Sequence, residues 1–157
     1  MSKATPATQA LTRAKLAFTL HSYAYDPGAE RIGLQAAEAL GEAPARVLKT
    51  LMTRVDGKPI CVVLASDREV AMKALAAAVG GKTAEMMPPA DAERLTGFKV
   101  GGISPFGQKR AAPTVIDAAA LTQPYVLING GQRGLLLRLD PASARDMLGA
   151  IVAAVSV

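Results

Sequence analysis

The stretch Gly101-Gly102-Ile103-Ser104-Pro105-Phe106-Gly107-Gln108-Lys109 places three glycines, a proline and a cation directly after the apolar and basic residues 98–100. Glycine lets the backbone approach a ligand closely and adopt a positive φ, and proline fixes a turn. A loop of this kind presents backbone N–H groups to an oxygen-rich partner such as a phosphate, a carboxylate or a developing oxyanion. The sequence therefore predicts a binding loop here and leaves its ligand open.

The composition indicates a globular chain with an aliphatic core. At 157 residues the chain is long enough for a core of its own, and we expect one domain over residues 1–157. Half of the residues are hydrophobic but only 4% are aromatic, which excludes disorder and argues against a surface that stacks RNA bases on aromatic rings. The net charge of +5 suits a polyanionic partner without requiring one.

The single cysteine and the absence of long apolar runs narrow the class further. Cys61 on its own excludes an intramolecular disulfide and a cysteine-based zinc site, and its apolar neighbours predict a buried core residue rather than a nucleophile. Residues 1–9 lack the apolar segment of a secretory signal, and no run approaches the roughly 20 residues that span a bilayer. We expect a soluble cytoplasmic protein with no membrane partner.

Periodicity and turn residues predict short helices and strands. Thr5-Pro6 is expected to cap a helix that runs to about Lys15, Ser66-Asp67-Arg68-Glu69 has the spacing of a capping box, and Asp140-Pro141 is expected to cap a last helix that reaches the C-terminus. The other expected helices run from Gly33 to Leu40 and over 90–96, and the helix opened by Ser66 is expected to end at Gly80-Gly81. Strands are expected over residues 18–23, 47–55, 60–65, 82–86, 113–116, 125–129 and 135–139.

Two hairpins are predicted, one at the turn Asp56-Gly57 and one at the glycine-rich turn 130–134. The strands thus come as hairpins separated by helices, without a regular βαβ alternation. This pattern favours an α+β fold with a mixed or antiparallel sheet, or a partly closed barrel, over a Rossmann or flavodoxin fold.

Two familiar catalytic motifs fail on inspection. Gly102 and Gly107 have P-loop spacing, but the following lysine stands one position late and no hydroxyl follows it to bind magnesium, so ATP hydrolysis is excluded. Ser104 lacks the G-x-S-x-G context of a nucleophile elbow, and the only histidine, His21, lies in a predicted strand where a structural role is more common. A Ser/His/Asp triad therefore has little support.

Three other polar residues remain ambiguous from pattern alone. Lys49 shares a strand face with Leu51 and Val55, so it is either an edge-strand charge or a charge that faces a ligand. Arg133 is typical of a solvated turn residue, and Tyr23, at the end of the first strand, is placed to rim the core.

Residues 46–51 (RVLKTL), 101–109 and 130–135 (GGQRGL), in this order and spacing, resemble the YbaK-type Cys-tRNA(Pro) deacylases of the bacterial prolyl-tRNA editing-domain superfamily. The match extends to residues 18–23 and includes the superfamily's G-x-x-x-P element. The resemblance implies an α/β (α+β) fold in which a twisted mixed sheet closes towards a barrel covered by helices. It also implies trans-editing of cysteine mischarged onto tRNA(Pro), which is needed because an apolar pocket separates similar side chains by only about 1–3 kcal/mol.

The resemblance also implies the site residues. Lys49 and Gly101 are expected to be catalytic: the lysine anchors the aminoacyl-adenosine end and offsets negative charge near the ester, while the amides around Gly101 and Gly102 hold ribose or ester oxygens. The implied substrate-binding residues are Tyr23, Gly102, Ile103, Ser104, Pro105, Asn129, Gly130, Gly131 and Arg133.

In this family the protein supplies no nucleophile, because the substrate's own thiol attacks its ester and releases tRNA and a cyclic thiolactone. Such intramolecular attack contributes roughly 7–11 kcal/mol through proximity. The resemblance therefore implies no cofactor and no metal. It implies mischarged tRNA(Pro) rather than DNA as the nucleic-acid partner, with prolyl-tRNA synthetase delivering the tRNA.

Two positions depart from the family pattern. Leu136 stands where well-studied cysteine deacylases carry an aspartate, and Asn129 stands where they often carry serine. A more apolar wall leaves the amino-acid preference open, since related members remove alanine or other small residues with water. A non-catalytic tRNA- or synthetase-binding module and a small-molecule hydrolase that uses Ser104 are the competing interpretations.

Overall fold

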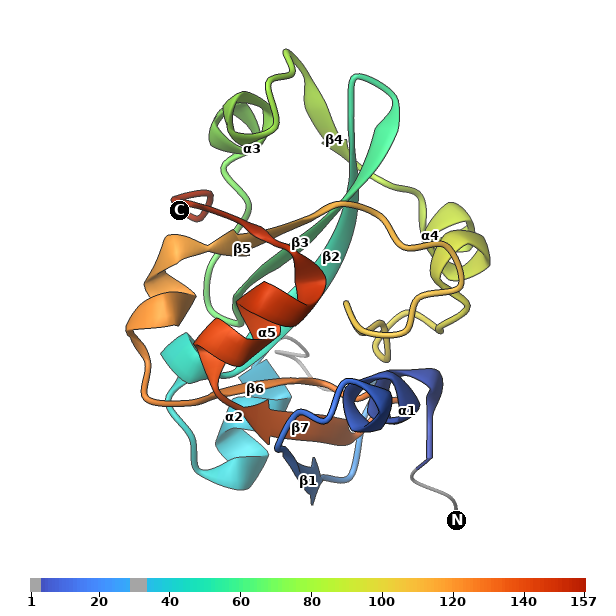
Figure 1. Ribbon diagram of the computed structural model, residues 1–157, viewed down its shortest axis with the longest axis vertical. Coiled ribbons are helices and arrows are strands. Elements are labelled where there is room, and N and C mark those ends of the chain that lie inside the picture. Colours follow the sequence, from blue (N-terminus) through green and yellow to red (C-terminus); the bar gives the residue numbers. More distant parts are fainter. Residues whose placement is uncertain (1–3, 29–33) are drawn as a thin grey trace.

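Two β-sheets form the framework of this chain in the computed structural model, which describes residues 4–28 and 34–157 (Figure 1). The helices are α1 (Pro6–Arg13), α2 (Gln35–Leu40), α3 (Met72–Ala78), α4 (Pro89–Thr96) and α5 (Pro141–Leu148), with 3-10 helices η2 (Pro44–Arg46) and η3 (Ala118–Thr122). The strands are β1 (Thr19–Ser22), β2 (Leu48–Val55), β3 (Lys58–Ala65), β4 (Ala84–Met86), β5 (Thr114–Asp117), β6 (Val126–Asn129), β7 (Leu135–Leu139) and β8 (Ile151–Ala153).

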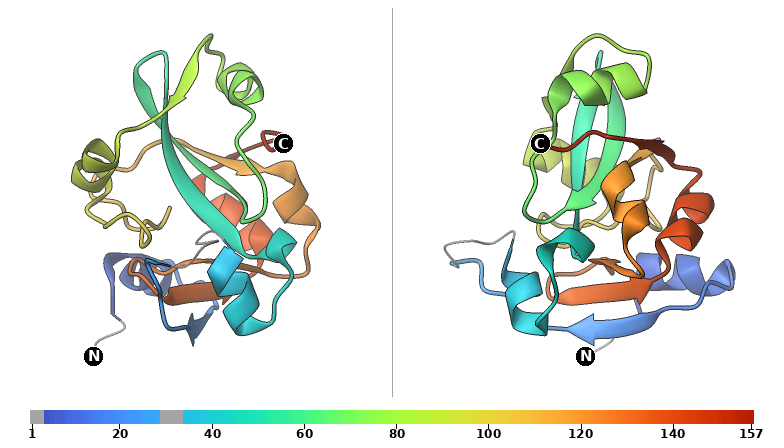
Figure 2. Two further views of the ribbon diagram at one scale, coloured as in Figure 1. Left: turned by 180° about the vertical axis from the view of Figure 1, so that it is seen from behind. Right: turned by 90° about the vertical axis from the view of Figure 1, so that its left-hand side faces the viewer.

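The sheets differ in direction and size. The three-stranded sheet has the order β1-β7-β6 and is antiparallel, whereas the five-stranded sheet has the order β4-β2-β3-β5-β8 with parallel β3-β5 and β5-β8 pairs. Figure 2 shows the long β2-β3 hairpin extending away from the three-stranded sheet. The expected mixed α/β architecture is confirmed.

The expected closure towards a barrel does not occur within the described residues. The two sheets are joined by one parallel bridge between Val47, just before β2, and Leu127 of β6. Beyond that bridge β2 pairs with β3 on one edge and, from Thr53 onward, with β4 on the other. The outer strands β1 and β8 each have only one strand neighbour, so the described sheets stay open and do not form a barrel.

The β2-β3 hairpin confirms the predicted turn. Asp56 and Gly57 have φ of 50° and 81°, the left-handed values that a two-residue type I′ turn requires. The strands pair in register from Leu48 with Ala65 to Val55 with Lys58. The second predicted hairpin is also present, with β6 and β7 pairing across residues 130–134.

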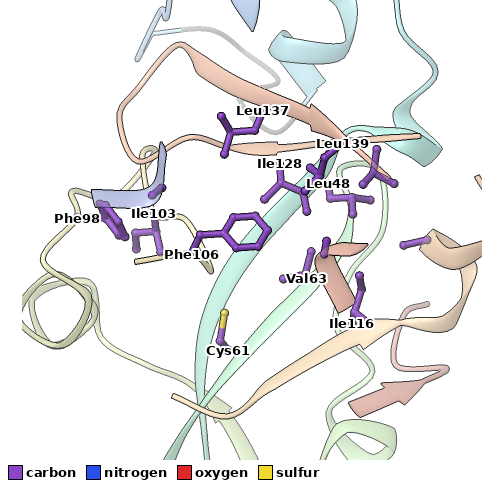
Figure 3. Packing of buried hydrophobic residues seen from close by; sticks show 14 of the residues in the cluster. Leu48, Cys61, Val63, Phe98, Ile103, Phe106, Ile116, Ile128, Leu137 and Leu139 are labelled. Carbon is purple, nitrogen blue, oxygen red and sulfur yellow. The ribbon is translucent and has the colours of Figure 1, made fainter. Parts of the chain in front are cut away.

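The core between the sheets is aliphatic apart from a few rings. Phe106 is only 1% exposed and projects from the 101–109 loop among side chains of both sheets (Figure 3). Cys61 and Val63 of β3 lie on one side of it, and Ile128 and Leu137 lie on the other. The predicted core role of Cys61 is confirmed.

The N-terminus of α1 fixes two glycine-rich segments. Thr5 caps the helix by accepting a hydrogen bond from the Thr8 N–H at 3.1 Å, and its hydroxyl donates to the Gly130 carbonyl oxygen. A Cβ on Gly107, where φ is +68°, would stand 2.3 Å from the Pro6 carbonyl oxygen. Helix α1 therefore packs tightly against the 101–109 loop while also holding the 130–134 turn.

The predicted capping box at residues 66–69 is wrong. Ser66 Oγ donates to the Pro44 carbonyl oxygen at 3.2 Å, and Glu69 exchanges two backbone hydrogen bonds with Val157. These residues are engaged by distant backbone, so α3 begins only at Met72, without a side-chain cap.

The last helix is shorter than predicted. It is capped by Asp140 as expected but ends at Gly149, where φ is 58°. Residues 151–153, which include the β-branched Ile151 and Val152, form β8, which pairs with β5. Asp117 accepts hydrogen bonds from the Val155 N–H and the Ser156 hydroxyl. The helix α2 ends at Gly41 as predicted, while its predicted start at Gly33 lies outside the described residues.

No helix in the described part of the chain is long and apolar enough to cross a membrane.

Cys61 gives a direct test of this packing. Burial raises the pKa of its thiol to about 12, against the smaller lowering effect of hydrogen bonds with Thr114 and Gln108. We expect the thiol to resist iodoacetamide at pH 8 in the folded protein and to react after denaturation, as followed by intact-protein mass spectrometry. Alkylation of the folded protein as fast as that of free cysteine would contradict the described core.

Candidate active site

A cavity of about 410 Å³ opens beside the unpaired stretch of β2. Between the bridge at Val47 and the β4 pairing at Thr53, this edge of β2 has no strand partner among the described residues. The 101–109 loop, the ends of β1 and β6, and the start of α4 close around the gap. The cavity therefore forms where the strand changes partner.

Lys49 lies on the open edge and lines the cavity. Its side chain is 23% exposed, and its Nζ is 3.9 Å from Oε1 of Glu69, whose side chain is 82% exposed. A pair this long with a solvated carboxylate is weak, so the ammonium keeps donors for a ligand. Of the two interpretations left open by the pattern, the placement favours a charge that faces a ligand.

Thr50 is a candidate that the sequence interpretation missed. Its residue lines the cavity, yet its Oγ1 is buried and has no hydrogen-bond partner in the described part of the chain. Buried hydroxyls nearly always have a partner, so an unpaired one at a cavity wall suggests that a ligand supplies it. The only sequence signal is a hydroxyl on the face shared by the apolar Leu48 and Met52.

The start of the 101–109 loop forms the facing wall. Gly101, with φ of +90°, and Ile103 both line the cavity. The Gly102 N–H donates to the Lys99 carbonyl oxygen at 2.7 Å, whereas the Gly101 N–H has no acceptor among the described residues. In this conformation the Gly101 amide is therefore the freer donor of the two.

Asn129 ties this loop to the 130–134 turn. Its Nδ2 donates to the Gly101 carbonyl oxygen at 3.2 Å, and its Oδ1 accepts from the Gly131 N–H at 2.7 Å. Because the amide is occupied at both ends, Asn129 positions the wall while also lining the cavity.

Tyr23 and Leu136 complete the cavity near β1 and β7. Burial raises the pKa of the Tyr23 phenol, with a smaller upward contribution from Tyr25, so the hydroxyl stays protonated at neutral pH as a donor. Leu136 is 3% exposed in an apolar cluster with Ala36 and Val47. This wall offers van der Waals contact rather than a hydrogen-bond acceptor.

The other expected site residues do not line the cavity. Ser104 is completely buried, and its Oγ accepts a hydrogen bond from the Phe106 N–H at 3.2 Å. Arg133 Nε donates to the Val100 carbonyl oxygen at 2.9 Å, with its guanidinium 5.4 Å from the Tyr25 ring centre. The residues outside the lining are Gly102, Ser104, Pro105, Gly130, Gly131 and Arg133.

Other reactive groups lie apart from the cavity. The His21 ring contacts the Thr19 hydroxyl at 2.9 Å on exposed β1, and neither His21 nor Cys61 lines the cavity. Within residues 4–28 and 34–157, no group of three or more His, Cys, Asp or Glu side chains is placed to hold a metal ion.

A family model for the aminoacyl-tRNA editing domain matches residues 27–147. The chain belongs to this family. The editing domain is similar to EbsC of Enterococcus faecalis, which is named as a candidate Cys-tRNA(Pro)/Cys-tRNA(Cys) deacylase: the two are 37% identical over 107 residues, 67% of this chain and 65% of EbsC. It is also 35% identical over 75 residues to the proline–tRNA ligase of Maridesulfovibrio salexigens, 48% of this chain and 13% of the ligase.

Solved structures share the fold of the editing domain. The hypothetical protein APE2540 has a TM-score of 0.86 at 25% identity and covers 98% of this chain with 100% of its own. A structure described as a candidate trans-editing enzyme for prolyl tRNA synthetase has a TM-score of 0.83 at 24% identity and covers 100% of this chain and 98% of its own. The second likeness shows the fold alone.

Substituting Gly102 tests the contact that builds the wall. An added Cβ would stand 2.8 Å from the Arg133 amide nitrogen and 2.9 Å from Gln132 backbone atoms, so the Gly102→Ala variant must push loop and turn apart. We expect a loss of about 1–3 kcal/mol in the free energy of unfolding, measured by urea denaturation. Gly28→Ala is the control, because its Cβ meets only the Asp26 carboxylate at 3.4 Å. Equal stabilities of the two variants would contradict this packing.

Proposed function

We propose that this editing domain is an aminoacyl-tRNA deacylase that removes a small amino acid, cysteine first, from mischarged tRNA(Pro). The observation that carries the proposal is that Lys49, Thr50 and Gly101 all line one cavity at an open strand edge. The family membership supports an aminoacyl-tRNA substrate, and the similarity to EbsC and to a segment of a proline–tRNA ligase supports tRNA(Pro). Delivery by prolyl-tRNA synthetase is part of the same proposal.

In this proposal the protein positions the ester and stabilises charge. The Lys49 ammonium anchors the aminoacyl-adenosine end and offsets negative charge as the carbonyl is attacked. The Gly101 N–H is the second donor, since the Gly102 N–H is occupied by Lys99 in the free protein. The Thr50 hydroxyl, buried without a partner, supplies a third polar contact to the ester or ribose.

The nucleophile is proposed to come from the substrate. Neither Ser104 nor Cys61 is accessible from the cavity, and His21 lies outside it. The cysteine thiol attacks its own ester carbonyl: a C–S bond forms, the C–O bond to the ribose breaks, and the ribose oxygen takes the thiol proton. The products are tRNA and a cyclic thiolactone, and holding the reactants in place supplies most of the acceleration.

Leu136 shapes the proposed selectivity. With an apolar side chain in place of a carboxylate, the wall selects by size and offers no hydrogen-bond acceptor to a thiol. Size alone separates substrates by about 1–3 kcal/mol, so alanine is the natural competitor. For an alanyl ester, water replaces the thiol as the attacking group.

Replacing the lysine is the first test. We expect the Lys49→Ala variant to slow release of amino acid from Cys-tRNA(Pro) by at least about 100-fold, because a preorganised charge is lost at the ester. Ala-tRNA(Pro) is assayed in parallel, and circular dichroism checks the fold. Lys58→Ala, at the far end of the same hairpin, is the matched control. Full activity in the Lys49→Ala variant would refute the mechanism. Faster cleavage of Ala-tRNA(Pro) than of Cys-tRNA(Pro) by the wild type would assign the enzyme to alanine instead of cysteine.

The unpaired hydroxyl of Thr50 gives a second test, which separates a role in binding from a role in the fold. The Thr50→Val variant keeps the shape and removes a hydroxyl with no partner among the described residues, so we expect unchanged or higher thermal stability. If that hydroxyl contacts the substrate, deacylation falls about tenfold while stability does not. A variant that loses stability and keeps its activity would assign Thr50 to the fold instead.

The competing interpretation is a non-catalytic module that binds tRNA or synthetase. It predicts strong, salt-dependent tRNA binding by a wild-type protein that leaves both esters intact. A small-molecule hydrolase that uses Ser104 is disfavoured by the complete burial of that residue.

A further inference from the structure

A second groove, of about 530 Å³, lies across α4 from the candidate active site. Pro89 and Ala92 of α4 line the active-site cavity, whereas Asp91 and Arg94 of the same helix line the groove. Met87, which precedes the helix, contributes to both. The two sites are therefore immediate neighbours that share one helix as their partition.

The groove is strongly basic. Its lining contains four cations and one carboxylate, which are Arg54, Arg94, Lys109, Arg110 and Asp91. The Arg54 guanidinium donates to Asp91 Oδ2 at 2.8 Å, and Arg94 also contacts this carboxylate. The hydrogen bond from Arg54 lowers the pKa of Asp91, so one fixed negative charge faces four positive ones. The nearby Glu93 is engaged elsewhere, because its Oε2 accepts from the Val100 N–H at 2.9 Å.

Backbone hydrogen bonds fix the positions of two of these cationic residues in the chain. The Lys109 N–H donates to the Thr96 carbonyl oxygen at 2.8 Å, and the Arg110 N–H donates to that of Leu95 at 3.0 Å. These bonds fasten the end of the 101–109 loop to the last turn of α4. The 101–109 loop therefore lines the active-site cavity at Gly101 and the groove at Lys109, and the next residue, Arg110, also lines the groove.

We propose that this groove binds the phosphodiester backbone of the tRNA acceptor end while the aminoacyl ester lies in the cavity, an inference that rests on the proposed function. Lys49 and Arg54 are five positions apart on β2, which is about 17 Å at 3.3 Å per residue. A chain of a few nucleotides spans that distance. Guanidinium forks suit phosphate oxygens, and the lining has none of the aromatic anchors that dominate protein interfaces, so RNA is favoured over an acidic protein.

The test reverses two charges in the groove. The Lys109→Glu/Arg110→Glu variant is compared with Lys73→Glu/Arg145→Glu, which makes the same change in net charge on α3 and α5. We measure the Kd for tRNA(Pro) over a range of salt concentrations, and cleavage of Cys-tRNA(Pro) and of 3′-O-cysteinyl-adenosine, which has no phosphodiester. A Lys109→Ala/Arg110→Ala variant provides the same readouts should the reversal disturb folding.

We expect the groove variant to weaken tRNA(Pro) binding about 20-fold at 0.1 M salt and to lower the slope of log Kd against log salt by about 1.4, as loss of two single-strand phosphate contacts requires. Cleavage of cysteinyl-adenosine stays unchanged, and the control variant behaves as wild type. Equal tRNA affinity in the two variants overturns the proposal. So does weaker binding of prolyl-tRNA synthetase with unaltered tRNA binding, which would assign the groove to a protein partner.

The failure of the proposed function is distinguishable from the failure of this inference. A wild-type protein that cleaves neither ester refutes the deacylase, whereas the salt slope still reports on the groove. A groove variant that loses cleavage of cysteinyl-adenosine as well overturns the inference, because the cations would then act on the cavity itself.

Discussion

The candidate active site depends on one close contact between two backbone segments. Gly102 lies against residues 132–133 so closely that a Cβ would stand 2.8 Å from the Arg133 nitrogen, and Asn129 ties both segments together. The start of helix α1 contacts both segments as well, with Pro6 against Gly107 of the loop and the Thr5 hydroxyl hydrogen-bonded to Gly130 of the turn. Interiors this tightly packed transmit small displacements, so the position of the Gly101 amide is set by contacts outside the cavity.

The second constraint is the change of partner along β2. An open strand edge exposes unpaired backbone groups, which most proteins cover or charge. Here the 101–109 loop and α4 stand across the gap without pairing with it, and Lys49 supplies the charge. The features that protect an edge from aggregation are thus the same features that make a polar, partly buried site. This explains why the strand pattern could not separate the two interpretations of Lys49.

The sequence predicted correctly those features that depend only on neighbouring residues. The Asp56-Gly57 turn, the Asp140 cap and the aliphatic strand with Cys61 each depend on neighbouring residues, and all are present. The capping box predicted at Ser66 is wrong because C-terminal residues hydrogen-bond to that segment. The predicted length of the last helix is wrong because residues 151–153 pair with the edge of β5 instead. Pairing over such separations leaves no periodic signal in either partner.

The site shows the same division. The glycines of the loop were evident, but whether each lines the cavity or supports it depends on packing that a motif does not encode. The sequence did not predict Thr50 as a site residue because threonine is common in strands. Only the tertiary structure shows that its hydroxyl is unpaired among the described residues. The Asp91 and Arg54 pair was equally invisible, since it joins α4 to β2.

The proposed division of labour between cavity and groove follows from the limits of apolar recognition. A cavity with Leu136 in its wall gains little from the difference between cysteine and alanine, and both differ from proline by only a few atoms. An enzyme that cannot reject correct esters by their side chain has to avoid them in another way. Binding the tRNA backbone through phosphate contacts adds affinity but carries no sequence information. For a cysteinyl ester, the proposed discrimination then comes from the reaction itself, because its thiol attacks its own ester and a prolyl ester has no thiol. In this scheme the groove determines how long the acceptor end stays, and the substrate's own chemistry determines whether it is cleaved.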